Sequence, residues 1–127
     1  GYSRSKSSRL LAKVWTSIRN IVSQLKKHPA SKAFIEPIDP NAPFAKEYAR
    51  VIKKPMNLRE ISLRLEREAS GAPAVYKTPR EIFDDVRLVW RNARTFNPKG
   101  HWICEQVDVL EESFESMWLS SQVDARW

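Results

Sequence analysis

Residues 78–103 read TPREIFDDVRLVWRNARTFNPKGHWI, and they decide the fold because they predict one long amphipathic helix with clear ends. Thr78 is a suitable N-cap, Pro79 suits the first helical position, and Glu81 can reach back to complete a capping box. Apolar residues then recur at helical spacing and predict one buried stripe: Ile82, Val86, Val89, Ala93 and Phe96. The helix should end near Phe96, since Pro98 disfavours helical geometry in the preceding residue.

Asn97 therefore stands at the end of a long apolar face. Its side-chain amide offers both hydrogen-bond donors and an acceptor, which could hold a small neutral polar group beside apolar walls. The local sequence by itself favours a simpler interpretation, in which Asn97 only ends the helix. Ile103 begins the next apolar run one short turn later.

The length of 127 residues is enough for one domain with a real core. No run is long and apolar enough to span a membrane, and no signal-peptide core follows the basic N-terminus, so we expect no membrane contact. Cys104 is the only cysteine, which excludes an internal disulfide and fits a reducing compartment.

The net charge of +7 is placed unevenly along the chain. Residues 1–28 hold seven of the 22 basic residues and none of the 15 acidic residues, so residues 29–127 carry 15 of each. A basic arm can contact nucleic acid or an acidic partner, whereas the simpler interpretation is a solvated helix face behind a disordered tail. The expected last helix carries only acidic charges, so attraction to the basic first helix is predicted.

The remaining chain predicts three further helices and one long loop. Residues 1–8 are expected to form a flexible basic tail, and residues 9–127 the domain. The helices should cover about 9–27, 57–68 and 101–120, with Asn57 as a second cap and a loop at 69–76. Leu10, Leu11, Val14, Trp15, Ile18, Val22 and Leu25 should face inward in the first of these. From Pro29 to Met56 many prolines alternate with large apolar residues, which predicts an ordered loop with a helical turn near 43–50. The fold class is therefore all-α, a four-helix bundle.

Catalytic and metal-binding patterns are missing from the sequence. The two histidines, His28 and His101, have no partners at metal-ligand spacing, so we expect no metal and no cofactor. His28 is better explained as a cation near a helix end. Cys104 has no nearby base and is better explained as a small apolar residue than as a nucleophile. We expect the protein not to be an enzyme.

Seven blocks of sequence together resemble a bromodomain, from about Leu10 to Trp118. They are Ala33–Asp39 (AFIEPID), Tyr48, Val51–Leu58 (VIKKPMNL), Ile61, Arg64-Leu65, Phe83–Ala93 (FDDVRLVWRNA) and Phe96-Asn97. The order and spacing of these blocks are highly specific. The resemblance implies a left-handed four-helix bundle with a pocket between its two interhelical loops. It also implies a nuclear chromatin and transcription protein that reads acetyl-lysine, usually on histone tails.

The resemblance assigns a role to each matching residue of that pocket. Asn97 would donate to the acetyl carbonyl, and Tyr48 would reach the same oxygen through a water molecule. Ile38 would line one wall, Phe34 would contact the acetyl methyl group at the floor, and Ile103 would flank the acyl group as gatekeeper.

Several positions of the expected pocket depart from the family pattern. The usual Trp-Pro-Phe shelf is replaced by Lys32-Ala33-Phe34, a change that bears on peptide affinity and sequence preference. Pro43 and Ala45 stand where leucine is frequent, and Phe96 stands where tyrosine is commoner. Trp102 would either supply a substitute aromatic wall or simply pack.

Two other functions remain open at this stage. One is a helical nucleic-acid-binding domain that uses the basic first segment, and weak nucleic-acid contact could also accompany peptide binding. The other is a bromodomain-like bundle that has lost its ligand and only joins proteins. Measuring affinity at several salt concentrations distinguishes nucleic-acid binding from acetyl-lysine binding, since binding to phosphate weakens steeply with salt. The expected partners are acetylated histone tails or other acetyl-lysine peptides, bound by a monomer.

Overall fold

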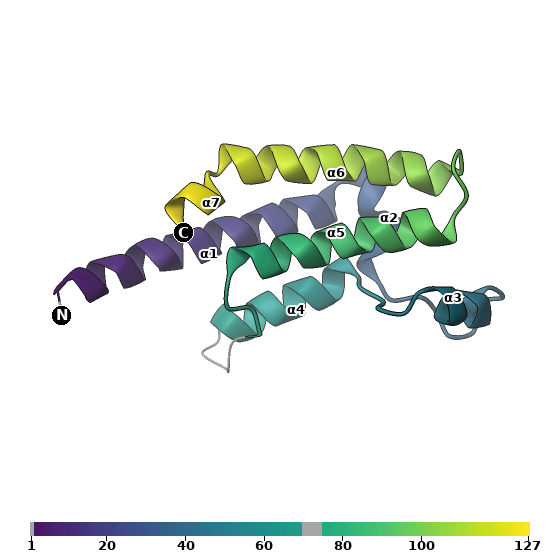
Figure 1. The fold of residues 1–127 in the computed structure, drawn as a ribbon, viewed down its shortest axis with the longest axis horizontal. Helices are drawn as coiled ribbons and strands as arrows, with labels where there is room; N and C mark the ends of the chain where they lie inside the picture. The colour runs from purple at the N-terminus through teal and green to yellow at the C-terminus, as the bar shows by residue number, and fades with distance from the viewer. Residues whose placement is uncertain (1, 70–74) are drawn as a thin grey trace.

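The computed structural model describes residues 2–69 and 75–127, and within those ranges it has helices and no strand. Four helices are long: α1 (Tyr2–Lys27), α4 (Leu58–Ala69), α5 (Pro79–Phe96) and α6 (Trp102–Ser120). Four are short: η1 (Pro29–Ser31), α2 (Lys32–Ile35), α3 (Ala45–Val51) and α7 (Val123–Arg126). Figure 1 shows the long helices packed side by side, with both termini at one end. The predicted all-helical bundle is confirmed, while the loop expected at 69–76 lies mostly outside the described residues.

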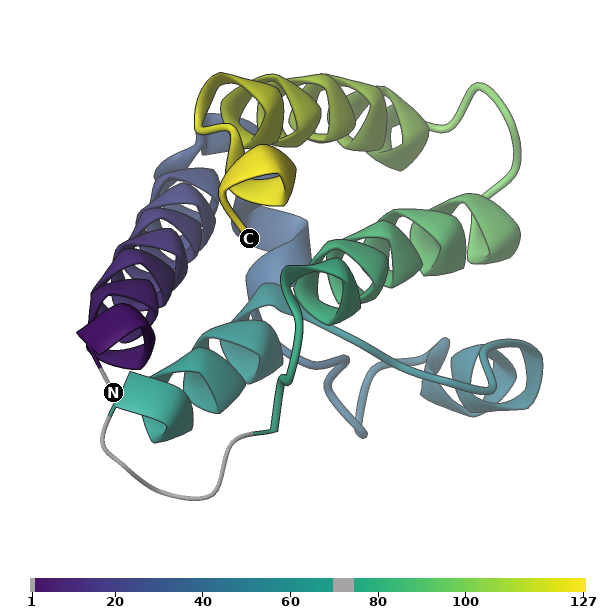
Figure 2. The same ribbon diagram turned by 60° about the vertical axis from the view of Figure 1, so that its left-hand side comes forward.

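The core lies between the four long helices, where their apolar stripes meet (Figure 2). The stripe predicted for α5 is buried as far as Ala93, and Phe96 is half-buried. Trp90 and Phe114 are the largest side chains that are fully buried. Leu10, predicted to face inward, is 52% exposed, because α1 runs past its neighbours at the N-terminal end in Figure 1. The start expected near Arg9 is also wrong, since α1 begins at Tyr2 and no proline or glycine interrupts those turns.

Of the two predicted N-caps, Asn57 makes the expected side-chain hydrogen bond and Thr78 does not. Asn57 caps α4 as predicted, because its Oδ1 accepts a 2.8 Å hydrogen bond from the backbone N–H of Glu60. Thr78 occupies the N-cap position of α5 but its side chain makes no capping bond, so that prediction is wrong. The Glu81 carboxylate does reach back, but it accepts from the backbone N–H of Lys77 at 3.1 Å. The Glu81 carboxylate therefore bonds the N–H one residue before the N-cap, and the expected capping box with Thr78 is not formed.

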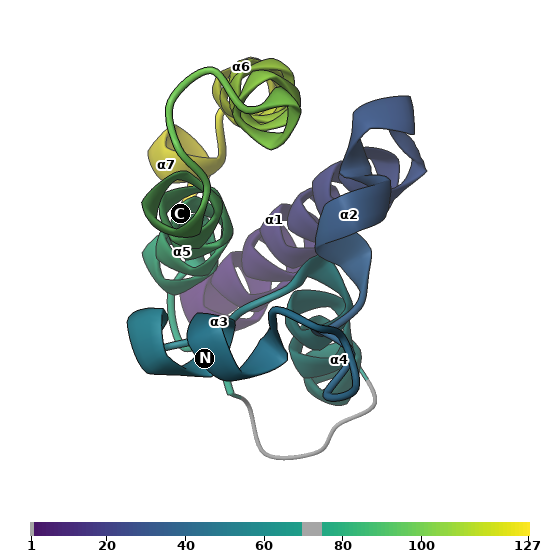
Figure 3. The same ribbon diagram turned by 90° about the vertical axis from the view of Figure 1, so that its right-hand side faces the viewer.

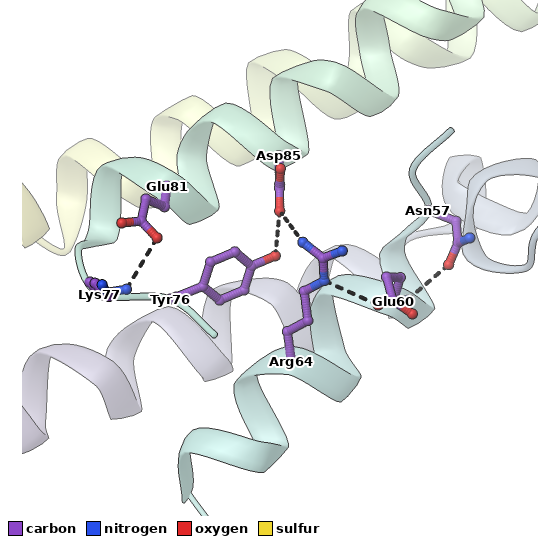
Figure 4. Close-up of polar contacts among 7 residues, drawn as sticks. All are labelled: Asn57, Glu60, Arg64, Tyr76, Lys77, Glu81 and Asp85. Atoms are coloured by element: carbon purple, nitrogen blue, oxygen red, sulfur yellow. Dashed lines mark hydrogen bonds and ion pairs between the residues drawn. The ribbon is translucent and has the colours of Figure 1, made fainter. Parts of the chain in front are cut away.

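A polar network ties α4, α5 and the segment before α5 together (Figure 4). The Tyr76 hydroxyl donates a 2.6 Å hydrogen bond to the Asp85 carboxylate, and Arg64 pairs with the same oxygen at 3.2 Å. Arg64 also donates to Glu60, one turn earlier in α4, at 3.0 Å. Burial, with help from Asp85, raises the pKa of Tyr76 well above its ordinary value, so the hydroxyl stays protonated as a donor.

The acidic helix α6 pairs with α5 and not with the basic α1. Arg94 of α5 bonds Asp108 at 2.8 Å and Glu111 at 3.1 Å, both on α6. Among the side chains that the structure describes, no ion pair joins α6 to α1. The predicted attraction between the first and last helices is therefore not realised as direct pairing, because α6 turns those carboxylates toward α5.

The long connection between α1 and α4 is ordered, as predicted, and is anchored at both ends. The Asn92 side chain, buried in α5, donates a 2.8 Å hydrogen bond to the backbone oxygen of Lys54. Near its start, Glu36 pairs with Arg59 of α4 at 2.9 Å. The helical turn expected near 43–50 is present as α3.

His28 was predicted to act as a cation near a helix end. Its Nδ1 instead accepts a hydrogen bond from the backbone N–H of Ala30 and caps η1.

Candidate binding site

The candidate site lies at the end of the bundle that carries both α3 and the α5–α6 connection (Figures 1 and 3). Asn97 is the C-cap of α5, and its backbone N–H bonds the oxygen of Ala93 at 3.0 Å. Its side-chain Nδ2 donates to the same oxygen, also at 3.0 Å. The half-buried amide is therefore held in one orientation by the turn of helix that precedes it.

The Asn97 amide keeps further hydrogen-bonding capacity. An amide NH₂ has two donors, and the Ala93 oxygen takes only one of them. Among the described residues, no other side-chain bond of Asn97 is formed. A donor and an acceptor thus remain for a ligand that enters this end of the bundle.

Two aromatic rings, one from α3 and one from its N-cap, pack on Phe96, the residue before Asn97. The Phe96 ring lies 4.9 Å from the Tyr48 ring, edge to face, and 5.9 Å from the Phe44 ring. Burial raises the pKa of Tyr48, so its hydroxyl is a neutral donor and acceptor. Phe44 was not among the predicted site residues, although its position four residues before Tyr48 places both on one helical face. Its ring is 45% exposed beside Phe96.

Phe34 and Ile103 belong partly to the core. Phe34 is buried and meets the Trp90 ring edge to face, with centroids 6.0 Å apart. The indole N–H of Trp90 is buried without a hydrogen-bond partner among the described residues. Ile103 is half-buried and packs against the same core. Both residues therefore supply fixed apolar surface near the start of α2 and of α6.

The start of α6 is held by a residue that sequence reasoning did not assign to the site. The Nδ1 of His101 accepts a 3.1 Å hydrogen bond from the backbone N–H of Ile103, which makes His101 the N-cap. Trp102 is 57% exposed, and its ring lies 5.6 Å from the His101 ring. Cys104 is half-buried, with its Sγ 3.7 Å from the backbone oxygen of Asn97. Trp102 is therefore available at the surface and is not a packed core residue.

Three predicted residues lie in the long connection between α1 and α4. Ile38 is half-buried, Pro43 is exposed, and Ala45 is the half-buried first residue of α3. Lys32 and Ala33, which replace the usual shelf, are exposed. The ring contact thus joins Tyr48 to Phe96, which directly precedes Asn97. That Ile38, Pro43 and Ala45 belong to the same site stays a prediction.

Two grooves are found away from these residues. One of about 360 Å³ is lined by Pro37, Met56 and Leu63 with their neighbours. The other, of about 330 Å³, lies between α1 and α6.

In the part of the chain that is described, no group of His, Cys, Asp and Glu side chains could hold a metal ion. None of the described helices has the length and apolar character needed to cross a bilayer.

Comparison with known proteins identifies similar sequences and a similar structure. The model of the bromodomain family matches residues 18–109. Transcription factor GTE3, chloroplastic, of Arabidopsis thaliana is 33% identical over 103 residues, covering 81% of this chain and 21% of that protein. Bromodomain-containing factor 2 of Saccharomyces cerevisiae is 32% identical over 122 residues, covering 94% of this chain and 18% of that protein. This chain therefore spans less than a quarter of the length of these relatives.

One similar solved structure is the second bromodomain of Candida albicans Bdf1, with a bound imidazopyridine. The two structures superpose with a TM-score of 0.74 at 26% sequence identity. The match covers 84% of this chain and 98% of the other. The helical bundle therefore has a counterpart in a solved structure.

Proposed function

The chain belongs to the bromodomain family, which consists of reader domains and not of enzymes, and we propose that it binds acetyl-lysine at the loop end of its bundle. The observation that carries this proposal is the Asn97 amide, which is oriented by Ala93 and keeps one N–H for a ligand. We also propose that the domain catalyses no reaction.

The chemistry of the ligand fits these side chains. Acetylation converts a strongly hydrated ammonium group into a neutral amide, whose burial costs a few kcal/mol unless its hydrogen bonds are replaced. Asn97 would donate to the acetyl carbonyl, and the Tyr48 hydroxyl would reach that oxygen through a water molecule. Phe34, Ile38 and Ile103 would surround the acetyl methyl group and the lysine stem.

Selectivity against unmodified lysine would come from desolvation. The ammonium group would have to leave water for aromatic and aliphatic surface, and an amide N–H cannot compensate a positive charge. The neutral ligand pays no such penalty. Binding should therefore depend on acetylation much more than on the salt concentration.

The rim of the site suggests how this domain would differ from its relatives. Lys32 and Ala33 give little apolar surface where a Trp-Pro shelf is usual. We propose that Trp102 and Phe44, both well exposed, provide aromatic surface at the rim in its place. Pro43, Ala45 and Phe96 would complete the wall on the side of α3.

The biological setting follows from the relatives and is proposed for this chain. Their names describe transcription factors, a bromodomain-containing factor and a nucleosome-remodelling factor subunit of Drosophila melanogaster. We propose that the domain acts as a monomer on acetylated histone tails or other acetyl-lysine peptides, in chromatin and transcription regulation. We propose a nuclear location, although two of the plant relatives are named as chloroplastic.

Calorimetric titration with matched peptide pairs tests the proposal. An array of acetylated histone-tail peptides would first identify a binder, which is then titrated in acetylated and unmodified form at low and high salt. We expect only the acetylated peptide to bind, with an affinity nearly independent of salt. Equal binding of both forms, or loss of binding as salt rises, would contradict an acetyl-lysine pocket.

A further inference from the structure

The outer face of α1 combines positive charge with neutral hydrogen-bonding groups. Lys13, Ser17, Asn20, Gln24 and Lys27 recur every three or four residues, so they form one stripe along the helix. The stripe spans about 21 Å at 1.5 Å per residue. Lys13 and Lys27, at its ends, are both exposed.

The groove of about 330 Å³ runs beside this stripe, between α1 and the C-terminal half of α6. Hydroxyls and amides dominate its lining: Ser17, Asn20, Gln24, Ser116, Ser120 and Ser121. The short helix α7 adds a cation, because Arg126 donates to the Ser17 hydroxyl at 3.1 Å and to the Ser121 backbone oxygen at 2.8 Å. Its guanidinium group is therefore held against two residues that line the groove.

The cations beside the groove are not held in ion pairs by the part of the chain that the structure describes. Lys13, Lys27 and Arg126 have no carboxylate partner among the described residues. Asp108 and Glu111 of α6 are engaged by Arg94, on the side of α6 that faces α5. The groove side of α6 presents Ser116 and Ser120, while Glu112 lies one turn before Ser116 and Glu115 directly precedes it.

The Asp124 carboxylate of α7 accepts a hydrogen bond from the Trp118 indole. Arg19, on another side of α1, donates to the Thr16 hydroxyl. Among the described side chains of residues 10–28, no lysine or arginine is held in an ion pair.

We propose that this groove, with Lys13, Lys27 and Arg126, binds the phosphate backbone of nucleic acid. Contacts to phosphate oxygens come from lysine, arginine, serine, asparagine and glutamine side chains, which are the residue types present here. Cations spread along a line, with neutral donors between them, suit a regularly charged polymer better than the irregular charge of an acidic peptide. The groove is lined by none of the acetyl-lysine site residues, so a peptide and a nucleic acid can be held together.

The test is binding of a 20-base-pair DNA duplex, measured by fluorescence anisotropy over a series of salt concentrations. One variant is Lys13→Gln/Lys27→Gln. The matched control is Lys46→Gln/Lys54→Gln, which removes the same charge from exposed lysines near α3. Each lost phosphate contact should reduce the slope of log K against log salt by roughly 0.9. We expect the groove variant to lose about two units of slope and to bind more than about tenfold more weakly near 0.1 M salt.

The control variant should behave like the unmodified chain, and both variants should keep their melting temperature. Equal loss in both variants would overturn the proposal, because it would mean attraction by net charge alone. Absence of duplex binding at low salt would also overturn it. So would a poly-glutamate peptide that binds the groove more tightly than the duplex, which would indicate an acidic protein partner.

Discussion

The side-chain Nδ2 of Asn97 lies 3.0 Å from the backbone oxygen of Ala93, one helical turn earlier in α5. This bond makes two interpretations of Asn97 compatible, since the same amide can end the helix and hold a ligand. One N–H satisfies the helix end and sets the orientation of the side chain. The other is left for a carbonyl oxygen of a ligand. A binding residue that is oriented before the ligand arrives loses less entropy on binding.

Replacement of Asn97 by alanine should abolish most binding while the fold is retained. The buried acetyl carbonyl would lose its donor, which costs about 1–3 kcal/mol. That cost corresponds to a loss of affinity of roughly fivefold to more than a hundredfold. Titration with an acetylated peptide gives the affinity, and a melting curve gives the stability.

Thr95→Ala is the matched control for that experiment. The Thr95 hydroxyl donates a 2.8 Å bond to the backbone oxygen of Arg91, so it makes the same kind of bond on an exposed face. The two variants should lose similar, small amounts of stability, and only Asn97→Ala should lose affinity. Affinity within twofold of the unmodified chain after Asn97→Ala would refute the binding role.

Removal of the Tyr48 hydroxyl should weaken binding more modestly. Tyr48→Phe keeps the ring that packs 4.9 Å from Phe96 and removes only the bond made through water. A neutral hydrogen bond contributes about 0.5–1.5 kcal/mol, so we expect a loss of roughly two- to tenfold in calorimetry. Tyr48→Ala should in addition lower the melting temperature, since the ring packing is lost. An unchanged affinity for Tyr48→Phe would remove Tyr48 from the proposed mechanism.

The Tyr76 hydroxyl should stabilise the fold in a pH-dependent way. Tyr76→Phe leaves Asp85 without its 2.6 Å hydrogen bond, and a bond to a charged group contributes about 1.5–3 kcal/mol. Because burial raises the pKa of Tyr76 in the folded state, the native state holds this proton more tightly than the unfolded chain does. The contribution is therefore complete below the ordinary tyrosine pKa of about 10 and falls as the pH rises above it.

Denaturant unfolding at pH 7 and at a series of values above 10 measures this effect. The stability difference between the unmodified chain and Tyr76→Phe should be constant below about pH 10 and should shrink above it. A difference that grows with alkaline pH would contradict the assigned direction of the pKa shift.

Restoring an aromatic shelf should strengthen binding of some peptides. Lys32 is exposed at the start of α2, two residues before the buried Phe34. Lys32→Trp would add apolar area at the mouth of the site without entering the core. Calorimetry on several acetylated peptides should reveal at least one tighter complex. If a stably folded variant bound every peptide more weakly, position 32 would not be the part of this domain that corresponds to the aromatic shelf.

The sequence alone determined the four long helices, apart from the start of α1, and much of the core. Helical spacing of apolar residues predicted α5 and its buried stripe, and Pro98 fixed its end at Phe96, because these signals act within a few residues of each other. The Asn57 cap was predictable for the same reason. The order of motif blocks was enough to indicate the family, since that order does not depend on how the helices pack.

The tertiary structure decided which residues meet across the chain. The α6 carboxylates bind Arg94 of α5 and not the cations of α1, because the rotation of each helix about its axis follows from burying its apolar stripe. Asn92 reaches Lys54 across 38 positions of sequence. The contact of Phe44 with Phe96 and the packing of α7 through buried Val123 likewise join distant segments. Such contacts depend on the packing of the whole core, which no local pattern of residues encodes.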